Sequence, residues 1–280
     1  MKKNHLKFLK EPSLESPSLI LCWSEDAGKL GPGATDFLIK TLEGERFCLI
    51  EPLEFFPLGE VEIKEDIIQF PESEFYSCSS KNLIIFKGVA PRFEWYKFLS
   101  LVLDVAEHYK VKECYTIGGM VSLAVNTSPR RMLTVVNKPE LKPPLAEYGL
   151  NTEMDFRTPP AGRPTLSSFF LWIAQKRNIA STNIWVETPF YLTDSDDVKA
   201  RKTLIEFMDK QFSLGIDLSG LNTQSEEQEG KIAQLRAAKP EVDGWLGKLE
   251  RSEPLTREEG EKLVKEMDGL FKRSPSTGSG

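Results

Sequence analysis

The chain has 280 residues, of which 40% are hydrophobic and 28% charged, as is typical of a globular protein with one large core or a core plus an appendage. Its formal net charge of −6 opposes binding to a phosphate backbone, so we expect no nucleic acid among its partners. No apolar run approaches the roughly 20 residues of a membrane span, and the N-terminus lacks the apolar segment of a signal peptide. We therefore expect a cytoplasmic protein without membrane contact.

The cysteines and histidines give no sign of a metal site. The 4 cysteines are widely spaced without a CxxC pair, and there are only 2 histidines. A zinc ribbon, a thioredoxin-type motif and a histidine-rich site are therefore not predicted, and we expect neither a metal nor another cofactor. Because Cys22, Cys48 and Cys114 lie in apolar runs, we interpret them as buried free thiols.

The first part of the chain alternates between strand and helix patterns. Residues 1–17 contain two prolines among polar residues and predict a loose lead-in. Short apolar runs bounded by turn-forming residues are typical of strands buried on both faces. Such runs occupy residues 19–23, 47–50, 83–86, 114–117, 132–136 and 184–186. The proline-bearing segment 52–80 shows weak alternation and predicts an excursion with a short strand or hairpin.

Helical patterns lie between several of these strands. Residues 93–109, 166–180 and 198–212 each carry apolar side chains at steps of three and four, which makes one apolar stripe per helix. Buried strands that alternate with helices favour parallel pairing with right-handed crossovers. The predicted fold of residues 18–221 is a three-layer α/β/α sandwich with a mostly parallel sheet.

The composition changes after Leu221. Residues 222–275 are charged and helical in pattern, with helices expected at 224–238 and 242–249. A last helix begins at a capping box formed by Thr256 and Glu259. Its apolar stripe must cover the main domain, a neighbouring helix or another subunit. We predict a C-terminal helical appendage over 222–275, followed by a loose tail at 276–280.

A glycine-rich turn follows the first strand and leads into a helix near Thr35. It contains Asp26, Gly28 and Gly31, and such a turn can present backbone N–H groups to an anion. It lacks the closing Gly-Lys-Ser/Thr of a P-loop and the glycine spacing of a dinucleotide fingerprint. The alternative is a tight turn between strand and helix with no ligand.

Three further loops lie at predicted strand ends, where ligands bind in open α/β sheets. Each has a structural alternative. The loop with Gly118 and Gly119 could serve close strand–helix packing, and the loop with Asn126 and Arg130 could be a solvated loop that faces a partner. The loop with Tyr191 could contain an aromatic pair that packs. Together with the glycine-rich turn, these loops supply the candidate ligand-binding residues Asp26, Gly28, Gly31, Gly118, Gly119, Asn126, Arg130 and Tyr191.

No catalytic residue can be assigned. Neither a Gly-x-Ser-x-Gly elbow nor a His-Glu-x-x-His pair occurs, so no nucleophile stands beside a base. The acidic residues Asp194, Asp196 and Asp197 are interpreted as a first helical turn favoured by the helix dipole. The sequence therefore leans away from an enzyme.

Taken in order, these landmarks resemble the proteasome assembly chaperone 2 family over about residues 18–221. They are Trp23-Ser24-Glu25-Asp26-Ala27-Gly28, Leu83 to Pro91 leading to Trp95, Gly118-Gly119-Met120, Pro129-Arg130, Pro160-Ala161-Gly162, Pro189-Phe190-Tyr191 and Ile216-Asp217-Leu218. The resemblance implies a fold like that of purine nucleoside phosphorylases and related hydrolases, with frequent self-association. It also implies, for some members, a chaperone role that holds proteasome subunits during ring assembly.

The chain departs from this family pattern at two kinds of position. Relatives often carry histidines where this chain has Asn126-Thr127-Ser128 and Phe190, so histidine-dependent chemistry is not expected. The sequence ends Gly278-Ser279-Gly280, so we expect no docking through the hydrophobic-Tyr-x tail of some proteasome-binding relatives.

We therefore expect an uncharacterised family member that acts as a non-catalytic, homo-oligomeric, protein-binding protein of the assembly-chaperone type. One alternative is a small-anion or nucleotide-binding enzyme, of phosphorylase, hydrolase or ligase type, with a cleft at the carboxyl ends of the strands. A second alternative is a scaffold that binds a protein partner through its acidic surface.

Overall fold

The computed structural model describes residues 5–155, 157–158 and 162–272. The chain divides into two compact units. The first unit comprises Met1–Glu25, Gly31–Gly118 and Met132–Trp185, and the second comprises Asp26–Leu30, Gly119–Arg131 and Val186–Gly280. The predicted tail 276–280, the start of the predicted lead-in, and Pro160 and Ala161 of one family landmark lie outside the described residues. The predicted domain boundary after residue 221 stays a prediction.

Within the described residues, one large sheet of 8 strands dominates the first unit. Its order is β1 (Leu6–Phe8), β3 (Glu45–Ile50), β6 (Ser73–Cys78), β7 (Leu83–Gly88), β2 (Ser18–Trp23), β8 (Glu113–Ser122), β10 (Ala180–Pro189) and β9 (Met132–Val136). Strand β2 is parallel to both β7 and β8, with Leu19 opposite Ile84 and Cys114. Strands β3 and β7 are both antiparallel to β6, so β3, β7, β2 and β8 run in one direction. The prediction of a mostly parallel sheet is confirmed.

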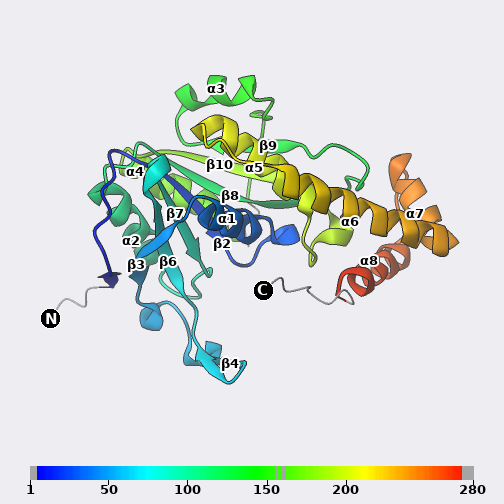
Figure 1. The fold of residues 1–280 in the computed structure, drawn as a ribbon, viewed down its shortest axis with the longest axis horizontal. Helices are drawn as coiled ribbons and strands as arrows, with labels where there is room; N and C mark the ends of the chain where they lie inside the picture. Colours follow the sequence, from blue (N-terminus) through cyan, green and yellow to red (C-terminus); the bar gives the residue numbers. More distant parts are fainter. Residues whose placement is uncertain (1–4, 156, 159–161, 273–280) are drawn as a thin grey trace. The chain divides into compact units, whose positions relative to one another are not determined.

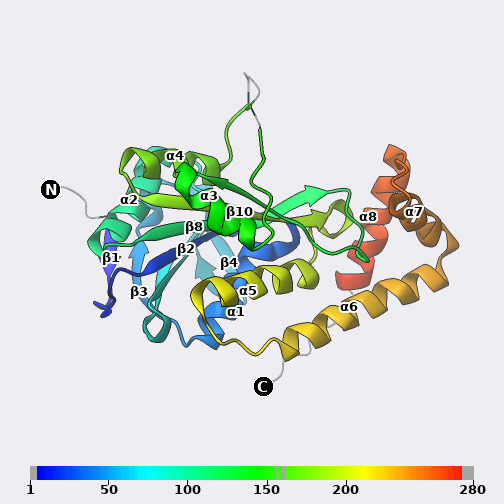
Figure 2. The same cartoon turned by 90° about the horizontal axis from the view of Figure 1, so that it is seen from above.

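Helices cover both faces of this sheet. Every residue of β2 is buried, as expected of a central strand between two helical layers. On one face, Leu19 and Leu21 share an apolar cluster with helices α2 (Trp95–His108) and α4 (Leu166–Lys176), which lie side by side in Figures 1 and 2. On the other face, Cys22 Sγ lies 3.2 Å from Thr35 Oγ1 of helix α1 (Leu30–Thr41). The predicted three-layer α/β/α sandwich is confirmed.

The sequence did not predict strands β1 and β6 or the short helix α3 (Lys142–Glu147). Strand β6 pairs antiparallel with β3 and β7, and its buried positions include Ser73 and Ser77. Serine at buried positions removes the apolar alternation by which a half-buried strand is recognised. The hairpin expected between 52 and 80 is present as β4 (Glu62–Lys64) and β5 (Ile67–Gln69).

The second unit is mainly helical. It contains α5 (Val198–Phe212), α6 (Ser219–Ala238), α7 (Pro240–Glu250) and α8 (Arg257–Lys272), close to their predicted positions. The capping box of α8 is confirmed: Thr256 N donates to Glu259 Oε2 at 2.8 Å, and Glu259 N donates to Thr256 Oγ1 at 3.2 Å. None of the described helices is both long and apolar enough to cross a bilayer.

The apolar stripe of α8 is covered within its own unit. Leu263 and Met267 are fully buried in a cluster that also contains Tyr191, Ile232 and Leu246. Of the three alternatives left open by the sequence, packing on neighbouring elements of the same unit accounts for this stripe. The stripe therefore does not need another subunit.

Candidate functional site

Most of the predicted ligand-binding residues fall in the second unit. Asp26, Gly28, Gly119, Asn126, Arg130 and Tyr191 belong to it, whereas Gly31 and Gly118 belong to the first unit. In the first unit, the carbonyl of Gly31 accepts a hydrogen bond from Thr35 Oγ1 at 2.9 Å, and Gly118 is buried in β8.

The glycine-rich turn is held against Gly119 of β8 by a side-chain hydrogen bond and a close backbone contact. Asp26 Oδ1 accepts a hydrogen bond from Gly119 N at 2.8 Å. A Cβ atom on Gly119 would lie only 2.1 Å from the carbonyl oxygen of Ala27. The two loops can approach this closely because residue 119 has no side chain. Close packing thus explains the glycine at 119 without a ligand.

Gly28 is likewise held by hydrogen bonds and close contacts with neighbouring residues of the second unit. Its φ of 66° lies in the left-handed region, which glycine adopts without strain. Its N–H donates to the carbonyl of Thr193 at 2.8 Å, and its carbonyl accepts from Asp197 N at 3.0 Å. A Cβ atom here would lie 2.9 Å from Thr188 Cγ2. The backbone N–H of Gly28, which could have bound an anion, is therefore already hydrogen-bonded within the protein.

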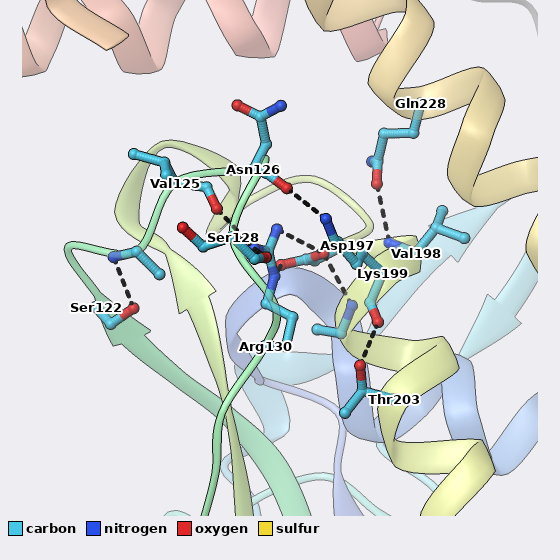
Figure 3. A network of polar contacts seen from close by, with 12 residues as sticks. Ser122, Val125, Asn126, Ser128, Arg130, Asp197, Val198, Lys199, Thr203 and Gln228 are labelled. Atoms are coloured by element: carbon cyan, nitrogen blue, oxygen red, sulfur yellow. Dashed lines mark hydrogen bonds and ion pairs between the residues drawn. The ribbon is translucent and has the colours of Figure 1, made fainter. Parts of the chain in front are cut away.

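Arg130 forms a buried ion pair with Asp197, shown in Figure 3. Its Nε donates to Asp197 Oδ2 at 3.0 Å and its Nη2 to Oδ1 at 3.3 Å, while its Nη1 donates to the carbonyls of Val125 and Ser128. The two side chains are 1% and 0% exposed. Asp197 also accepts from Ala200 N at 3.0 Å, so the same carboxylate caps helix α5.

Tyr191 and Lys199 bind the backbone of the neighbouring loop. The Tyr191 hydroxyl accepts from Asn126 N at 2.7 Å and donates to Asn126 Oδ1 at 3.2 Å. Burial raises the pKa of Tyr191 well above its ordinary value, so the hydroxyl keeps the proton that it donates. Lys199 Nζ donates to the carbonyl of Asn126 at 2.9 Å and to Glu229 at 2.6 Å.

We call this set of residues, Asn126, Arg130, Tyr191, Asp197 and Lys199, the Arg130 cluster. Each of its cations faces a carboxylate, Arg130 that of Asp197 and Lys199 that of Glu229, and Tyr191 bonds to Asn126. The cluster therefore carries no uncompensated positive charge to attract an anion. Its contacts join the loop of Asn126 and Arg130 to Tyr191 and to the start of helix α5. Ligand binding by the eight candidate residues stays a prediction.

The sequence did not indicate the partners of these residues. Asp197 was interpreted as part of a first helical turn, and it is the N-cap of α5. A cap can be inferred from an aspartate before an amphipathic helix. Its pairing with Arg130, 67 positions away, has no local signal. Within the part of the chain that the structure describes, no group of three or more His, Cys, Asp or Glu side chains could hold a metal ion.

A hollow of about 790 Å³ lies in the first unit beside the start of the glycine-rich turn, where Ser24 and Glu25 line it. Its cations are paired with carboxylates: Arg46 with Glu74, Lys87 with Asp36, and Arg92 with Glu25 and Glu60. Five glutamates line the hollow against these three paired cations, so its described lining offers no unpaired cation to an anionic ligand.

Comparison with known proteins places the chain in a family. The family model described as the PAC2 family matches residues 24–236, well over half of the sequence. The chain belongs to the PAC2 family. The resemblance to the proteasome assembly chaperone 2 family is thereby confirmed. No curated protein matches the sequence.

Solved structures share the PAC2 fold at low identity. Rv2714 of Mycobacterium tuberculosis, a protein of unknown function, is 21% identical with a TM-score of 0.76, over 90% of this chain and 91% of that chain. Rv2125 of the same organism, a proteasome-assembly chaperone homologue, is 17% identical with a TM-score of 0.67, over 78% and 94%. PbaB of Pyrococcus furiosus, an archaeal proteasome activator, is 22% identical with a TM-score of 0.64, over 82% and 98%.

Several of the PAC2 landmarks in this sequence have a clear structural role. Gly28 and Gly119 permit close loop contacts, Arg130 supplies the buried cation, and Tyr191 bonds the loop at Asn126. All four are parts of one packed region of the second unit. In this chain, these four landmark residues therefore hold loops of the second unit together.

Proposed function

We propose that this PAC2 family member is a non-catalytic, oligomeric, protein-binding protein of the assembly-chaperone type. An exposed aromatic surface in the first unit is the observation that carries the proposal. Two similar structures are described as a proteasome-assembly chaperone homologue and an archaeal proteasome activator, which makes proteasome subunits the first partners to test. The buried free cysteines of the described residues are consistent with a reducing compartment such as the cytoplasm.

We define the aromatic surface as five residues on or next to helices α2 and α4. They are Trp95, Phe169 and Trp172, whose rings lie close together, and the exposed Phe93 and Tyr96, which are near Trp95 in sequence. Phe93, Tyr96 and Trp172 are 52%, 60% and 49% exposed. The rings of Phe169 and Trp172 stack with centroids 5.8 Å apart, and Trp95 lies 6.4 Å from Phe169. Aromatic side chains are enriched in the centres of protein interfaces, where they act as rigid anchors.

The non-catalytic part of the proposal has two supports. The sequence lacks a nucleophile beside a base, and the polar side chains of the Arg130 cluster are bonded within the chain. General acid–base catalysis needs a titratable group that reaches a substrate proton, whereas Arg130, Tyr191 and Asp197 are buried and hydrogen-bonded to protein atoms.

A binding experiment tests the proposal. Wild-type protein and a Tyr96→Ala/Trp172→Ala variant would each capture proteins from the organism that supplies the chain, with quantitative mass spectrometry of the captured proteins. We expect proteasome subunits to bind the wild type, and the variant to retain roughly thirtyfold less, as for loss of an interface hot spot.

Tyr148→Ala is the matched control, because Tyr148 is also an exposed aromatic residue of the first unit and lies outside the aromatic surface. Its capture should equal that of the wild type. Equal capture by all three proteins, or no protein partner above background for the wild type, would refute the protein-binding role.

A further inference from the structure

The hairpin β4–β5 exposes an unusual number of apolar side chains. Ile63, Ile67 and Ile68 are 78%, 63% and 73% exposed, and Leu58 just before the hairpin is 74% exposed. Figure 1 shows the hairpin, at the label β4, reaching away from the large sheet of the first unit. In the described residues it forms a sheet of 2 strands only. Two strands alone are marginally stable in water, and a free apolar edge tends to pair with another chain.

The turn of the hairpin determines which backbone groups face outward. Glu65 and Asp66 have φ values of 51° and 62°, as in the two-residue turn that best fits a twisted hairpin. Lys64 and Ile67, which flank this turn, are opposite one another and exchange the first pair of hydrogen bonds. Because bonded and non-bonded pairs alternate, the N–H and C=O of Ile63 point away from β5. Both groups are therefore presented at the open edge of β4.

We propose that β4 pairs with β4 of a second copy of this chain, antiparallel about a two-fold axis through Ile63. Each Ile63 then donates its N–H to the carbonyl of the other Ile63, which satisfies the open edge. The proposal rests on the oligomeric part of the proposed function and names the contact. It does not involve the aromatic surface.

Charge complementarity indicates that the strand that pairs with the open edge of β4 comes from a second copy of this chain. In this register, Glu62 of each copy lies opposite Lys64 of the other, so the pairing creates two ion pairs. The alternative edge, β5 paired about Ile68, would place Ile67 opposite Gln69 and gain no charge pair. Glu62 and Lys64, which flank Ile63, have opposite charges. Two copies of β4 therefore place opposite charges face to face only when the strands pair antiparallel.

Side-chain packing supports the same register. Ile63 lies opposite Ile68 in the hairpin, so these two side chains share one face. Joining two hairpins through β4 places the four isoleucines of both copies in one row. β-branched side chains pack well in such cross-strand rows. The exposed apolar residues on this face of the hairpin therefore become partly covered.

The contact spans only three residues of each copy, so we expect a dimer that dissociates on dilution. Sedimentation velocity of the full chain over a range of concentrations measures it. Glu62→Lys puts lysine opposite lysine, and Lys64→Glu puts glutamate opposite glutamate. Each single variant should weaken dimer formation about tenfold or more, because like charges directly opposite repel.

Two combinations make the test specific for self-pairing. The double variant Glu62→Lys/Lys64→Glu again sets opposite charges face to face and should dimerise like the wild type. An equal mixture of the two single variants should form mixed dimers. Lys112→Glu, an exposed charge reversal elsewhere in the first unit, is the control and should not change dimer formation.

The outcomes separate this inference from the proposed function. An oligomer that sediments identically with and without the charge reversals overturns the hairpin contact and leaves oligomerisation standing. A wild type that stays monomeric at all concentrations overturns both the contact and the oligomeric part. Partner capture through the aromatic surface is measured independently and is unaffected by either result.

Discussion

The guanidinium of Arg130 and the carboxylate of Asp197 are both withdrawn from water, with side chains 1% and 0% exposed. Removing two charges from water costs free energy that their attraction and hydrogen bonds roughly offset. The pair therefore adds little net stability. Its effect is structural: it links the loop around Arg130 to the first turn of α5, where Asp197 also binds Ala200 N.

Removal of one partner should be costly. We expect Arg130→Met to lower the free energy of unfolding by about 3–5 kcal/mol, because Asp197 is left as a buried uncompensated charge. Asp197→Asn keeps an oxygen for Ala200 N and removes that charge. The double variant should therefore lose less than the sum of the two single variants, as measured by urea unfolding.

Arg257→Met provides the comparison, since the Arg257 side chain is 92% exposed in the same unit. Its free energy of unfolding should stay within about 0.5 kcal/mol of the wild type. Strict additivity in the double variant would contradict a coupled pair.

Among the elements, helix α8 combines a local start signal with a tertiary contact. Thr256 and Glu259 bond reciprocally at its N-terminus, while Leu263 and Met267 are fully buried in the second unit. Glu259 also accepts from Lys248 of α7 at 2.6 Å. That bond, together with those from Thr256, lowers the pKa of Glu259. The cap therefore stabilises the first turn of a helix whose apolar face is already held.

Loss of the cap should cost a moderate amount of stability. We expect Thr256→Ala to lower the free energy of unfolding by about 1 kcal/mol, because the amide of Glu259 loses its acceptor. Hydrogen exchange of the first-turn amides of α8 should accelerate in the same variant. Thr256→Ser keeps the hydroxyl and serves as the control; equal exchange in the two variants would show that the cap is not stabilising.

At the scale of the whole molecule, the four cysteines are free and buried. Burial raises the pKa of the Cys78 thiol to about 11 and that of Cys48 to about 12, from an ordinary value of 9.0. Burial also raises the pKa of Cys114. The folded chain therefore retains thiol protons at a pH where the unfolded chain has lost them.

This difference predicts that alkali destabilises the fold. Where the unfolded state binds fewer protons than the folded state, the free energy of unfolding falls as pH rises. The thiol contribution should be constant below about pH 8 and should decline from about pH 9 upward, through the raised pKa values. Urea midpoints across this range measure the decline.

Cys78→Ala should make the decline shallower, whatever its effect on stability at neutral pH, since one titrating thiol is gone. A midpoint that stays constant or rises between about pH 9 and about 10 would contradict the prediction.

Sequence patterns predicted elements whose signal is local. The apolar run Leu19 to Trp23 is nearly all of β2, and the capping box marks the start of α8 within a residue. Strand β6 escaped prediction because Ser73 and Ser77 occupy buried positions. The antiparallel pairing of β6 with its neighbours was missed for the same reason, since a strand that is not recognised cannot be paired.

The sequence by itself determined the layer order, the central parallel strands and the family. Buried apolar runs and amphipathic stripes can be recognised from it because each depends only on residues that are close together in the chain. It also identified loops that meet in the second unit. Only the tertiary structure decided what those loops do. Arg130 finds Asp197 at a separation of 67 positions, and Gly119 lies against the backbone at Ala27. Such contacts depend on how the chain folds back on itself, and no local pattern encodes the partner of a buried charge.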